Sequence, residues 1–264
     1  MSIKSKLKNF FKSAAEVASD MIFPEGITCI ACNGELGGGE LYQLCRNCKI
    51  EFNNHFCQRC GRAVKDLAKF CDQCQNRTEY YFDYARSSLE YNKTASQLIY
   101  NFKYGNARYL APNLAEFLYK TAQSENFLDN IDLVTFVPLH KKRQRTRGYN
   151  QAELLAKAFS TCCGIVTKPL LIKATHTKNL ARLTKQERIA AIKNSFELAQ
   201  DISFNKATNS TVPKPLKNKT ILLIDDVLTT TATADECARI LKKQGGANRV
   251  IILTLTSVES NINI

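Results

Sequence analysis

Eight of the eleven cysteines fall within residues 29–74, and this clustering constrains the fold of the chain more than any other sequence feature. They form four Cys-x-x-Cys pairs: Cys29/Cys32, Cys45/Cys48, Cys57/Cys60 and Cys71/Cys74. Each pair presents two thiolates on one tight turn, and two pairs complete the tetrahedral site that structural zinc prefers. Since so short a segment cannot fold on its apolar residues alone, we expect metal ions to stabilise it.

The spacing of the pairs favours two sequential four-cysteine zinc sites, one within residues 29–48 and one within residues 57–74. In each site the two pairs lie far enough apart to form a ribbon that closes on one metal ion. An interleaved arrangement, in which the first and third pairs share a metal, is an alternative that the spacing leaves open. His55 is a further alternative ligand, and the regular repetition of the pairs disfavours a redox role.

The charge of the chain indicates what it binds. A formal net charge of +13 over 264 residues favours polyanions such as nucleic acid, phosphorylated metabolites or an anionic membrane surface. A well-solvated basic surface is the alternative. Residues 1–23 contain no apolar run long enough for a signal peptide, and no stretch reaches transmembrane length. Together with the metal-binding thiolates, these features predict a cytoplasmic location.

Three segments differ in composition. Residues 1–23 have apolar positions at helical spacing and predict an amphipathic helix, which would pack on the protein or, alternatively, rest on a membrane surface. Residues 24–78 form the predicted double zinc ribbon. In residues 79–264, strand-like runs alternate with helical ones, which predicts an α/β fold: a mostly parallel sheet with helices on both faces. The expected strands are 84–91, 131–138, 221–224 and 250–255, and the expected helices include 152–159 and 233–244.

A strand followed by acidic and hydroxyl residues predicts a ligand site near the C-terminus. Ile221–Ile224 is apolar at every position, as expected of a central parallel strand. Asp225 and Asp226 follow at its carboxyl end, where open α/β sheets bind ligands. The next residues form a hydroxyl-rich loop that opens a helix and suits a phosphate group: Thr229, Thr230, Thr231, Ala232 and Thr233. An N-cap cluster after an acidic turn is the alternative.

Residues 221–233 resemble the phosphoribosyl pyrophosphate (PRPP) motif of type I phosphoribosyltransferases. The cysteine pairs and three further segments narrow the resemblance to the ComF family of competence proteins, which includes GntX-like proteins. The segments are Phe102-Lys103-Tyr104-Gly105, Val137-Pro138-Leu139-His140, and Arg147-Gly148-Tyr149-Asn150-Gln151 leading into Leu154-Leu155-Ala156. The resemblance covers about residues 21–254 and implies a type I phosphoribosyltransferase fold for residues 79–264.

The resemblance also implies roles for individual residues. Asp225 and Asp226 would hold the ribose hydroxyls, with Mg²⁺ accompanying PRPP, and Thr229–Thr233 would wrap the 5′-phosphate. The pyrophosphate loop would consist of Leu139, His140 and Lys141. Residues 173–196 would form a lid that closes over PRPP, with Lys185 and Arg188 as candidate phosphate contacts.

This chain departs from the family pattern at three positions. Thr231 replaces the loop glycine, and its Cβ would hinder close approach of the backbone to phosphate unless φ is negative. Leu180 and Ala191 stand where the lid usually carries Gln and Asn. These departures bear on turnover more than on PRPP binding.

A run without acidic residues extends from residue 138 to 152 and is a candidate nucleic-acid site. Its basic residues are Lys141, Lys142, Arg143, Arg145 and Arg147. A pyrophosphate group or a DNA strand would explain the run, and simple solvation is the alternative. Five aromatic residues lie among basic ones and could stack on bases, although we expect most of them in the core: Tyr100, Phe102, Tyr104, Tyr109 and Tyr149.

Two functions follow from these features. One is a phosphoribosyltransferase that displaces pyrophosphate from PRPP by an acceptor that the sequence does not specify. The other is a non-catalytic accessory factor that binds single-stranded DNA and uses the fold as a ligand-binding scaffold. The ComF resemblance implies a link to DNA uptake and natural transformation, with the DNA-uptake machinery at the inner membrane as a partner.

Overall fold

The computed structural model describes residues 28–38, 40–64, 68–77, 79–174, 192–199 and 214–258. The expected N-terminal helix and the lid residues Lys185, Arg188, Leu180 and Ala191 lie outside these ranges. The chain divides into two compact units, residues 1–49 and 50–264, so the division falls between the second and third cysteine pairs. The boundaries expected from composition, after residues 23 and 78, stay predictions.

The described part of the first unit holds the first two cysteine pairs in short turns. The Cys29 amide donates to the Gly34 carbonyl over 2.7 Å, and the Asn33 amide donates to the Cys29 carbonyl over 2.8 Å. An antiparallel bridge between Thr28 and Glu35 closes this turn. The 3-10 helix η1 (Leu41–Gln43) precedes the second pair.

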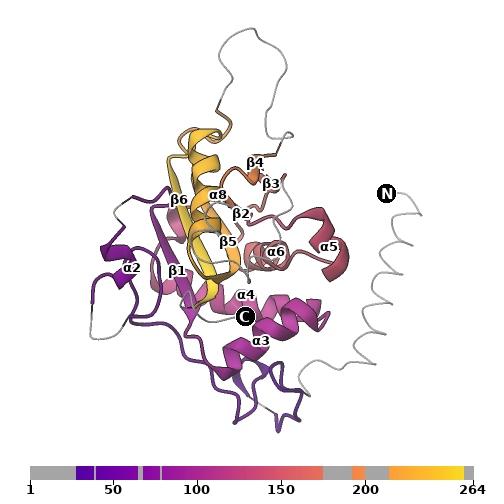
Figure 1. The fold of residues 1–264 in the computed structure, drawn as a ribbon. Coiled ribbons are helices and arrows are strands. Elements are labelled where there is room, and N and C mark those ends of the chain that lie inside the picture. The colour runs from indigo at the N-terminus through magenta and orange to yellow at the C-terminus, as the bar shows by residue number, and fades with distance from the viewer. Residues whose placement is uncertain are drawn as a thin grey trace, which may run out of the picture. The chain divides into compact units, whose positions relative to one another are not determined.

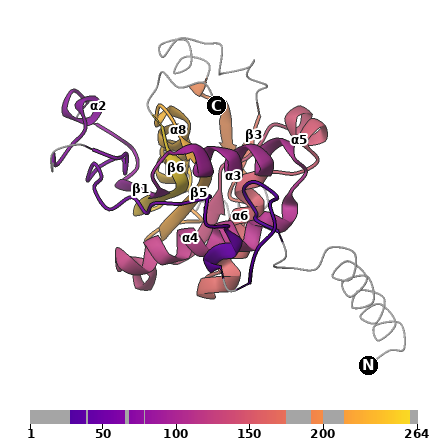
Figure 2. The ribbon, with the colours of Figure 1, turned by 90° about the horizontal axis from the view of Figure 1, so that it is seen from below.

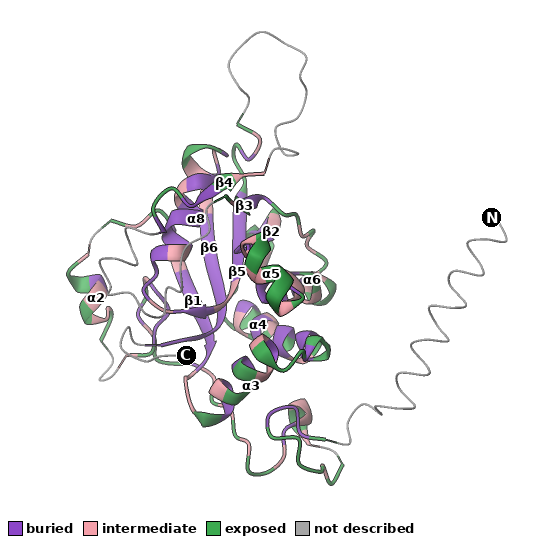
Figure 3. Cartoon of the chain, turned by 45° about the vertical axis from the view of Figure 1, so that its right-hand side comes forward, coloured by how far each residue is buried: buried purple, intermediate pink, exposed green. Residues whose placement is uncertain are grey.

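A four-stranded parallel sheet forms the centre of the second unit, in the order β1-β6-β5-β2 (Figure 1). The strands are β1 (Tyr84–Leu89), β2 (Leu133–Phe136), β5 (Thr220–Leu228) and β6 (Arg249–Ser257). The two inner strands, β5 and β6, are buried along almost their whole length (Figure 3). Their continuous apolar runs are typical of strands covered on both faces.

Helices cover both faces of the sheet, as predicted (Figure 2). Helices α4 (Ala111–Ser124) and α6 (Gln151–Cys163) pack together on one face, and α8 (Ala232–Lys243) lies on the other. The other elements in the described residues of this unit are α2 (Asp72–Gln75), α3 (Lys93–Tyr104), η2 (Arg108–Leu110), η3 (Leu128–Asn130), α5 (Lys141–Arg147), β3 (Leu171–Lys173) and β4 (Phe196–Leu198). Among the described residues, no helix is long and apolar enough to cross a membrane.

The segment that leads into the sheet covers the outer edge of β1. The Asn53 amide donates to the Ser88 carbonyl over 2.9 Å, and the Ala85 amide donates to the Arg59 carbonyl over 2.8 Å. Phe52 forms an isolated antiparallel bridge with Leu89. These bonds satisfy backbone groups that an edge strand would otherwise leave open to another chain.

The observed elements confirm the predicted α/β class, with two local differences. Strand β5 continues to Leu228, because its pairing with β6 runs on after β2 has ended at Phe136. Asp225 and Asp226 therefore lie within the strand and not after it. The basic run forms the short helix α5, which the sequence analysis did not expect. Its N-cap is His140, whose Nδ1 accepts a hydrogen bond from the Lys142 amide over 3.2 Å.

Candidate functional site

The eight clustered cysteines form two sequential tetrads, as predicted. The first tetrad contains Cys29, Cys32, Cys45 and Cys48, and the second contains Cys57, Cys60, Cys71 and Cys74. Within each tetrad the four Sγ atoms lie within 4.8 Å of one another. The interleaved arrangement is therefore wrong, and His55 belongs to neither tetrad.

The sulfur geometry fits zinc. The distance from Cys32 Sγ to Cys45 Sγ is 3.7 Å, and that from Cys60 Sγ to Cys71 Sγ is 3.6 Å. A tetrahedron with Zn–S bonds of about 2.3 Å has sulfur–sulfur edges of about 3.8 Å. A disulfide bond would need about 2.05 Å. With four thiolates each, both tetrads offer closed sites of the structural kind, with no ligand position open to substrate.

The second tetrad is part of the core of the α/β unit. Cys57 and Cys60 are fully buried and Cys74 is 3% exposed. They belong to one apolar cluster with residues of β5, β6 and α8, including Ala232 and Ala234. Metal bound here would therefore stabilise the sheet as well as the ribbon.

Asp225 and Asp226 lie at the carboxyl edge of the sheet. Both are partly buried, and the Asp226 amide donates to Asp225 Oδ1 over 2.9 Å. Burial raises the pKa of Asp225 well above its usual range, and the negative charge of Asp226 raises it further. The Asp225 carboxylate thus lacks full compensation, and a bound cation or a hydroxyl-bearing ligand would supply it.

Two lysines approach this pair from elements far away in the sequence. Lys103, on α3, forms an ion pair with Asp226 in which Nζ and Oδ2 are 3.1 Å apart. Lys173, at the end of β3, interacts electrostatically with both Asp225 and Arg143 of α5. Burial lowers the pKa of Lys173, and the positive charge of Arg143 lowers it further. The edge of the sheet therefore carries paired acids surrounded by cations.

The loop from Thr229 to Thr233 connects β5 to the start of α8. Thr230 and Thr231 are only 4% and 2% exposed. Thr231 has a φ of 63°, a left-handed conformation that is costly for a β-branched residue. The glycine of the family motif would adopt this conformation freely. Thr231 therefore lacks the negative φ that would let its Cβ avoid hindering the approach of phosphate. The Thr231 hydroxyl is buried and has no hydrogen-bond partner in the described structure.

The structure brings the predicted pyrophosphate loop to the same edge. Phe136 pairs with Ile224, and the Val137 amide donates to the Ile224 carbonyl over 3.0 Å. Leu139, His140 and Lys141 therefore leave β2 beside the strand that carries the acids. In helix α5, Lys141, Lys142 and Arg145 are exposed, whereas Arg143 and Arg147 are partly buried.

The sequence predicted no role for Lys103, although this residue stands in a segment that matches the family pattern. Lys173 was expected only as the first residue of the lid, and Arg62 only as one of the basic residues between the cysteine pairs that could meet phosphates or form a solvated surface. Nothing in the local sequence indicates that these three side chains approach residues 225–229, because each contact joins distant parts of the chain. Arg62, next to the third cysteine pair, donates through Nη2 to the Thr229 carbonyl.

Comparison with known proteins identifies the family. Residues 18–75 match the double zinc ribbon domain. Over 222 residues the chain is 30% identical to competence protein F of Haemophilus influenzae, a match that covers 82% of this chain and 91% of that protein. The chain belongs to the ComF family of competence proteins. The double zinc ribbon predicted for this ComF-family chain is confirmed by the domain match and the two tetrads.

Other ComF relatives are more distant. Competence protein ComFC of Bacillus subtilis is 28% identical over 216 residues, covering 80% of this chain and 81% of that protein. DNA utilization protein YhgH of Escherichia coli is 25% identical over 229 residues, covering 83% of this chain and 92% of that protein.

Solved structures resemble this ComF-family chain only weakly. Glutamine PRPP amidotransferase from B. subtilis has a TM-score of 0.38 and 15% identity, covering 59% of this chain and 30% of that one. An adenine phosphoribosyltransferase has a TM-score of 0.33 and 13% identity, covering 56% of this chain and 70% of that one. TM-scores this low do not support a fold assignment, so the α/β assignment depends on the strand order and the helix layers.

Proposed function

We propose that the chain binds PRPP, or a related sugar phosphate, with magnesium at the carboxyl edge of the sheet. The proposal depends on one observation above all: Asp225 and Asp226 lie near the carboxyl end of β5, which leads into a buried hydroxyl loop that opens α8. The acids suit vicinal ribose hydroxyls, and the first amides of α8, which lack intrahelical acceptors, suit the 5′-phosphate. The unpartnered hydroxyl of Thr231 supports a ligand there, since buried polar groups are normally paired.

The reaction that we propose is displacement of pyrophosphate from the anomeric carbon of the ribose by an acceptor. Magnesium prefers oxygen ligands and would be held beside PRPP by the carboxylates of Asp225 and Asp226. Lys173 and Arg143 would offset negative charge on the departing pyrophosphate, and Lys141 would contribute from the pyrophosphate loop. The chain would thus act by positioning and by charge stabilisation. We expect it to work in the reducing cytoplasm, where its thiolates stay available to metal.

Calorimetric titration of PRPP and magnesium into wild type, Asp226→Asn and Asp132→Asn tests this site. Asp132 is a matched control, because its carboxylate pairs with Lys219 at 2.7 Å, near the amino ends of the strands. We expect Asp226→Asn to weaken binding at least tenfold, since a charged partner is worth about 1.5–3 kcal/mol, while Asp132→Asn binds like wild type. Equal affinity of wild type and Asp226→Asn would rule out the assigned site.

The same variants test catalysis. Pyrophosphate release from PRPP would be followed with nucleobases as candidate acceptors, and Asp226→Asn is expected to abolish it. An undiminished rate of pyrophosphate release in this variant would rule out the proposed catalytic site. PRPP binding without release by wild type would leave the ligand-binding scaffold as the function.

Binding of single-stranded DNA is the second candidate function, and it is favoured by a group of exposed tyrosines. Tyr100, Tyr104 and Tyr109 are 60%, 55% and 66% exposed, so the expectation that most of the five aromatics lie in the core is wrong for these three. The rings of Tyr100 and Tyr104 lie 5.3 Å apart, and the Arg147 guanidinium lies 5.1 Å from the Tyr104 ring centroid. Aromatic rings beside cations stack bases without sequence preference.

Fluorescence anisotropy with a labelled oligothymidylate tests this function. We expect Tyr104→Ala to weaken binding by about 1–3 kcal/mol. Reversing the charges of Arg143, Arg145 and Arg147 should weaken it and make its salt dependence shallower, with the zinc content unchanged. Tyr81→Ala, which removes an exposed tyrosine elsewhere, is the control and should bind like wild type. DNA affinity that none of these changes alters would exclude this surface.

A further inference from the structure

Arg62 connects the second tetrad to the loop that follows the acidic pair. It lies two residues after Cys60 and is only 9% exposed. Its Nη2 donates to the Thr229 carbonyl, and its Nη1 donates to Gln73 Oε1 over 2.8 Å. Since Gln73 lies between Cys71 and Cys74, one guanidinium joins both cysteine pairs of the tetrad to the loop.

The burial of Arg62 indicates a specific role for its hydrogen bonds. Removing a guanidinium from water is unfavourable unless its donors find partners. Among the described residues Arg62 has no acidic partner, and its Nε atom has no hydrogen bond. The positive charge is therefore held beside the Thr229 carbonyl, where it also favours an anion at the loop.

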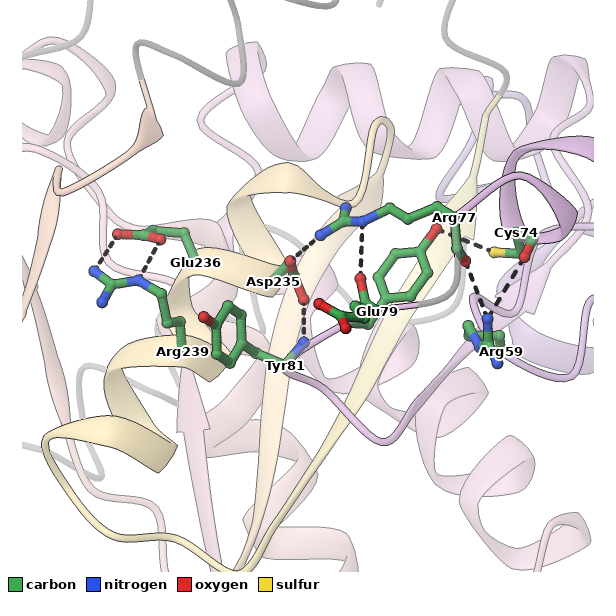
Figure 4. Close-up of polar contacts among 9 residues, drawn as sticks. Arg59, Cys74, Arg77, Glu79, Tyr81, Asp235, Glu236 and Arg239 are labelled. Atoms are coloured by element: carbon green, nitrogen blue, oxygen red, sulfur yellow. Dashed lines mark hydrogen bonds and ion pairs between the residues drawn. The ribbon is translucent and has the colours of Figure 1, made fainter.

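The far end of the loop is attached to the same region. The Asp235 carboxylate, in the first turn of α8, pairs with Arg77, which lies three residues after Cys74 (Figure 4). It also accepts a hydrogen bond from the Tyr81 amide over 2.6 Å. Contacts from the second tetrad and its flanking residues thus hold both the start of the loop, at Thr229, and the first turn of the helix that follows it, at Asp235.

The conformation of the loop explains why such attachment is needed. Thr231 is left-handed although it is β-branched, and residues in such conformations persist only where the surroundings over-determine them. With no side-chain cap at the start of α8, the loop lacks that local means of support. The contacts from Arg62 and Arg77 provide the constraint from outside.

We propose that Arg62 is a positioning residue, which fixes the backbone of residues 229–231 to the second tetrad so that the loop amides are preorganised for an anion. The identity of the anion at the loop depends on the function proposed above, but the geometry of the loop does not. Affinity for the sugar phosphate therefore depends on a side chain of the zinc ribbon that is not a metal ligand.

Hydrogen–deuterium exchange and calorimetry of Arg62→Met and Arg62→Lys test the proposal. In Arg62→Met we expect faster exchange in peptides that cover residues 227–234, with β1 and β6 exchanging as in wild type. PRPP affinity should fall about tenfold or more, because a hydrogen bond from a charged donor is lost. For Arg62→Lys we expect loop exchange and PRPP affinity between those of wild type and Arg62→Met, since a single ammonium cannot reproduce the contacts of both guanidinium nitrogens.

Three controls separate positioning from loss of structure. Zinc content must remain at two equivalents in each variant, as measured by chelator titration. Arg46→Met, at an exposed arginine within the second cysteine pair, should leave loop exchange unchanged. Gln73→Ala, which removes the partner of Nη1 but no thiolate, should show a smaller loop effect than Arg62→Met.

Hydrogen–deuterium exchange tests the role of Arg62, and calorimetry of wild type tests the proposed function, so each can be refuted without the other. Wild-type loop exchange in Arg62→Met would overturn the proposal whether or not PRPP binds. If wild type binds PRPP and Arg62→Met binds it equally well, the proposal is likewise wrong. If wild type binds no PRPP, the proposed function fails, and the exchange measurement still decides the role of Arg62.

Discussion

Replacing Thr231 by glycine should stabilise the protein in the absence of ligand. The left-handed conformation of Thr231, with φ of 63°, costs a β-branched residue about 1–2 kcal/mol relative to glycine. Its buried, unpartnered hydroxyl costs about 1–3 kcal/mol. Against these gains stand about 0.5–1 kcal/mol for the greater freedom of glycine in the unfolded chain and about 0.8 kcal/mol for the lost methyl group.

The balance predicts that Thr231→Gly raises the free energy of unfolding by about 2 kcal/mol. For a chain of this size, 1 kcal/mol corresponds to about 2–4 °C in Tm, so thermal unfolding should show an increase of several degrees. No capping bond is lost, because the Thr231 side chain makes none at the start of α8.

Thr230 provides a matched control in the same loop. It is 4% exposed, against 2% for Thr231, and among the described residues it is not one with positive φ. Thr230→Gly therefore releases no strain and should lower stability by about 1–2 kcal/mol through the unfolded chain and lost packing. Destabilisation of both variants to the same extent would refute the assignment of strain to Thr231.

Two further predictions concern the acids and the metal. Because the pKa of Asp225 is raised in the folded state, that state binds the proton more tightly than the unfolded chain, and stability falls as pH rises from about 4 toward the raised value. The Tm advantage of Asp225→Asn over wild type should therefore grow with pH across that window, and a pH-independent difference would contradict it. Cys74→Ser and Cys45→Ser should each lose one zinc equivalent, but only Cys74→Ser should unfold the sheet, as judged by circular dichroism, because Cys74 lies in its apolar core. Equal loss of sheet structure in both variants would contradict this.

Local sequence patterns predicted the elements whose signals are contained within a few residues. The apolar run at 221–224 and the hydroxyl-rich stretch after it predicted β5 and α8, and the regular spacing of the cysteines predicted the sequential tetrads. The extension of β5 to Leu228 could not be predicted, because it depends on how far its neighbour β6 continues. Helix α5 was missed because the basic run carries no apolar face that would give a helical period.

The contacts around the acidic pair were beyond local sequence patterns for a different reason. Lys103 and Asp226, like Arg62 and Thr229, are more than a hundred positions apart, and only the folded chain brings them together. The conformation of Thr231 is the reverse case. A β-branched residue argues against positive φ, yet Thr231 adopts it.

The position of β1 at the edge of the sheet has a consequence for how the protein is made. Its sheet neighbour among the described strands is β6, which begins about 160 residues later, at Arg249. At roughly 5–20 residues per second, β1 leaves the ribosome about 10–30 s before that partner exists. In this interval the segment at residues 51–59, held by the tetrad to which its own Cys57 belongs, can already shield one side of the strand from aggregation. We therefore expect the yield of native protein to depend on the zinc supply during translation more than on zinc added after synthesis.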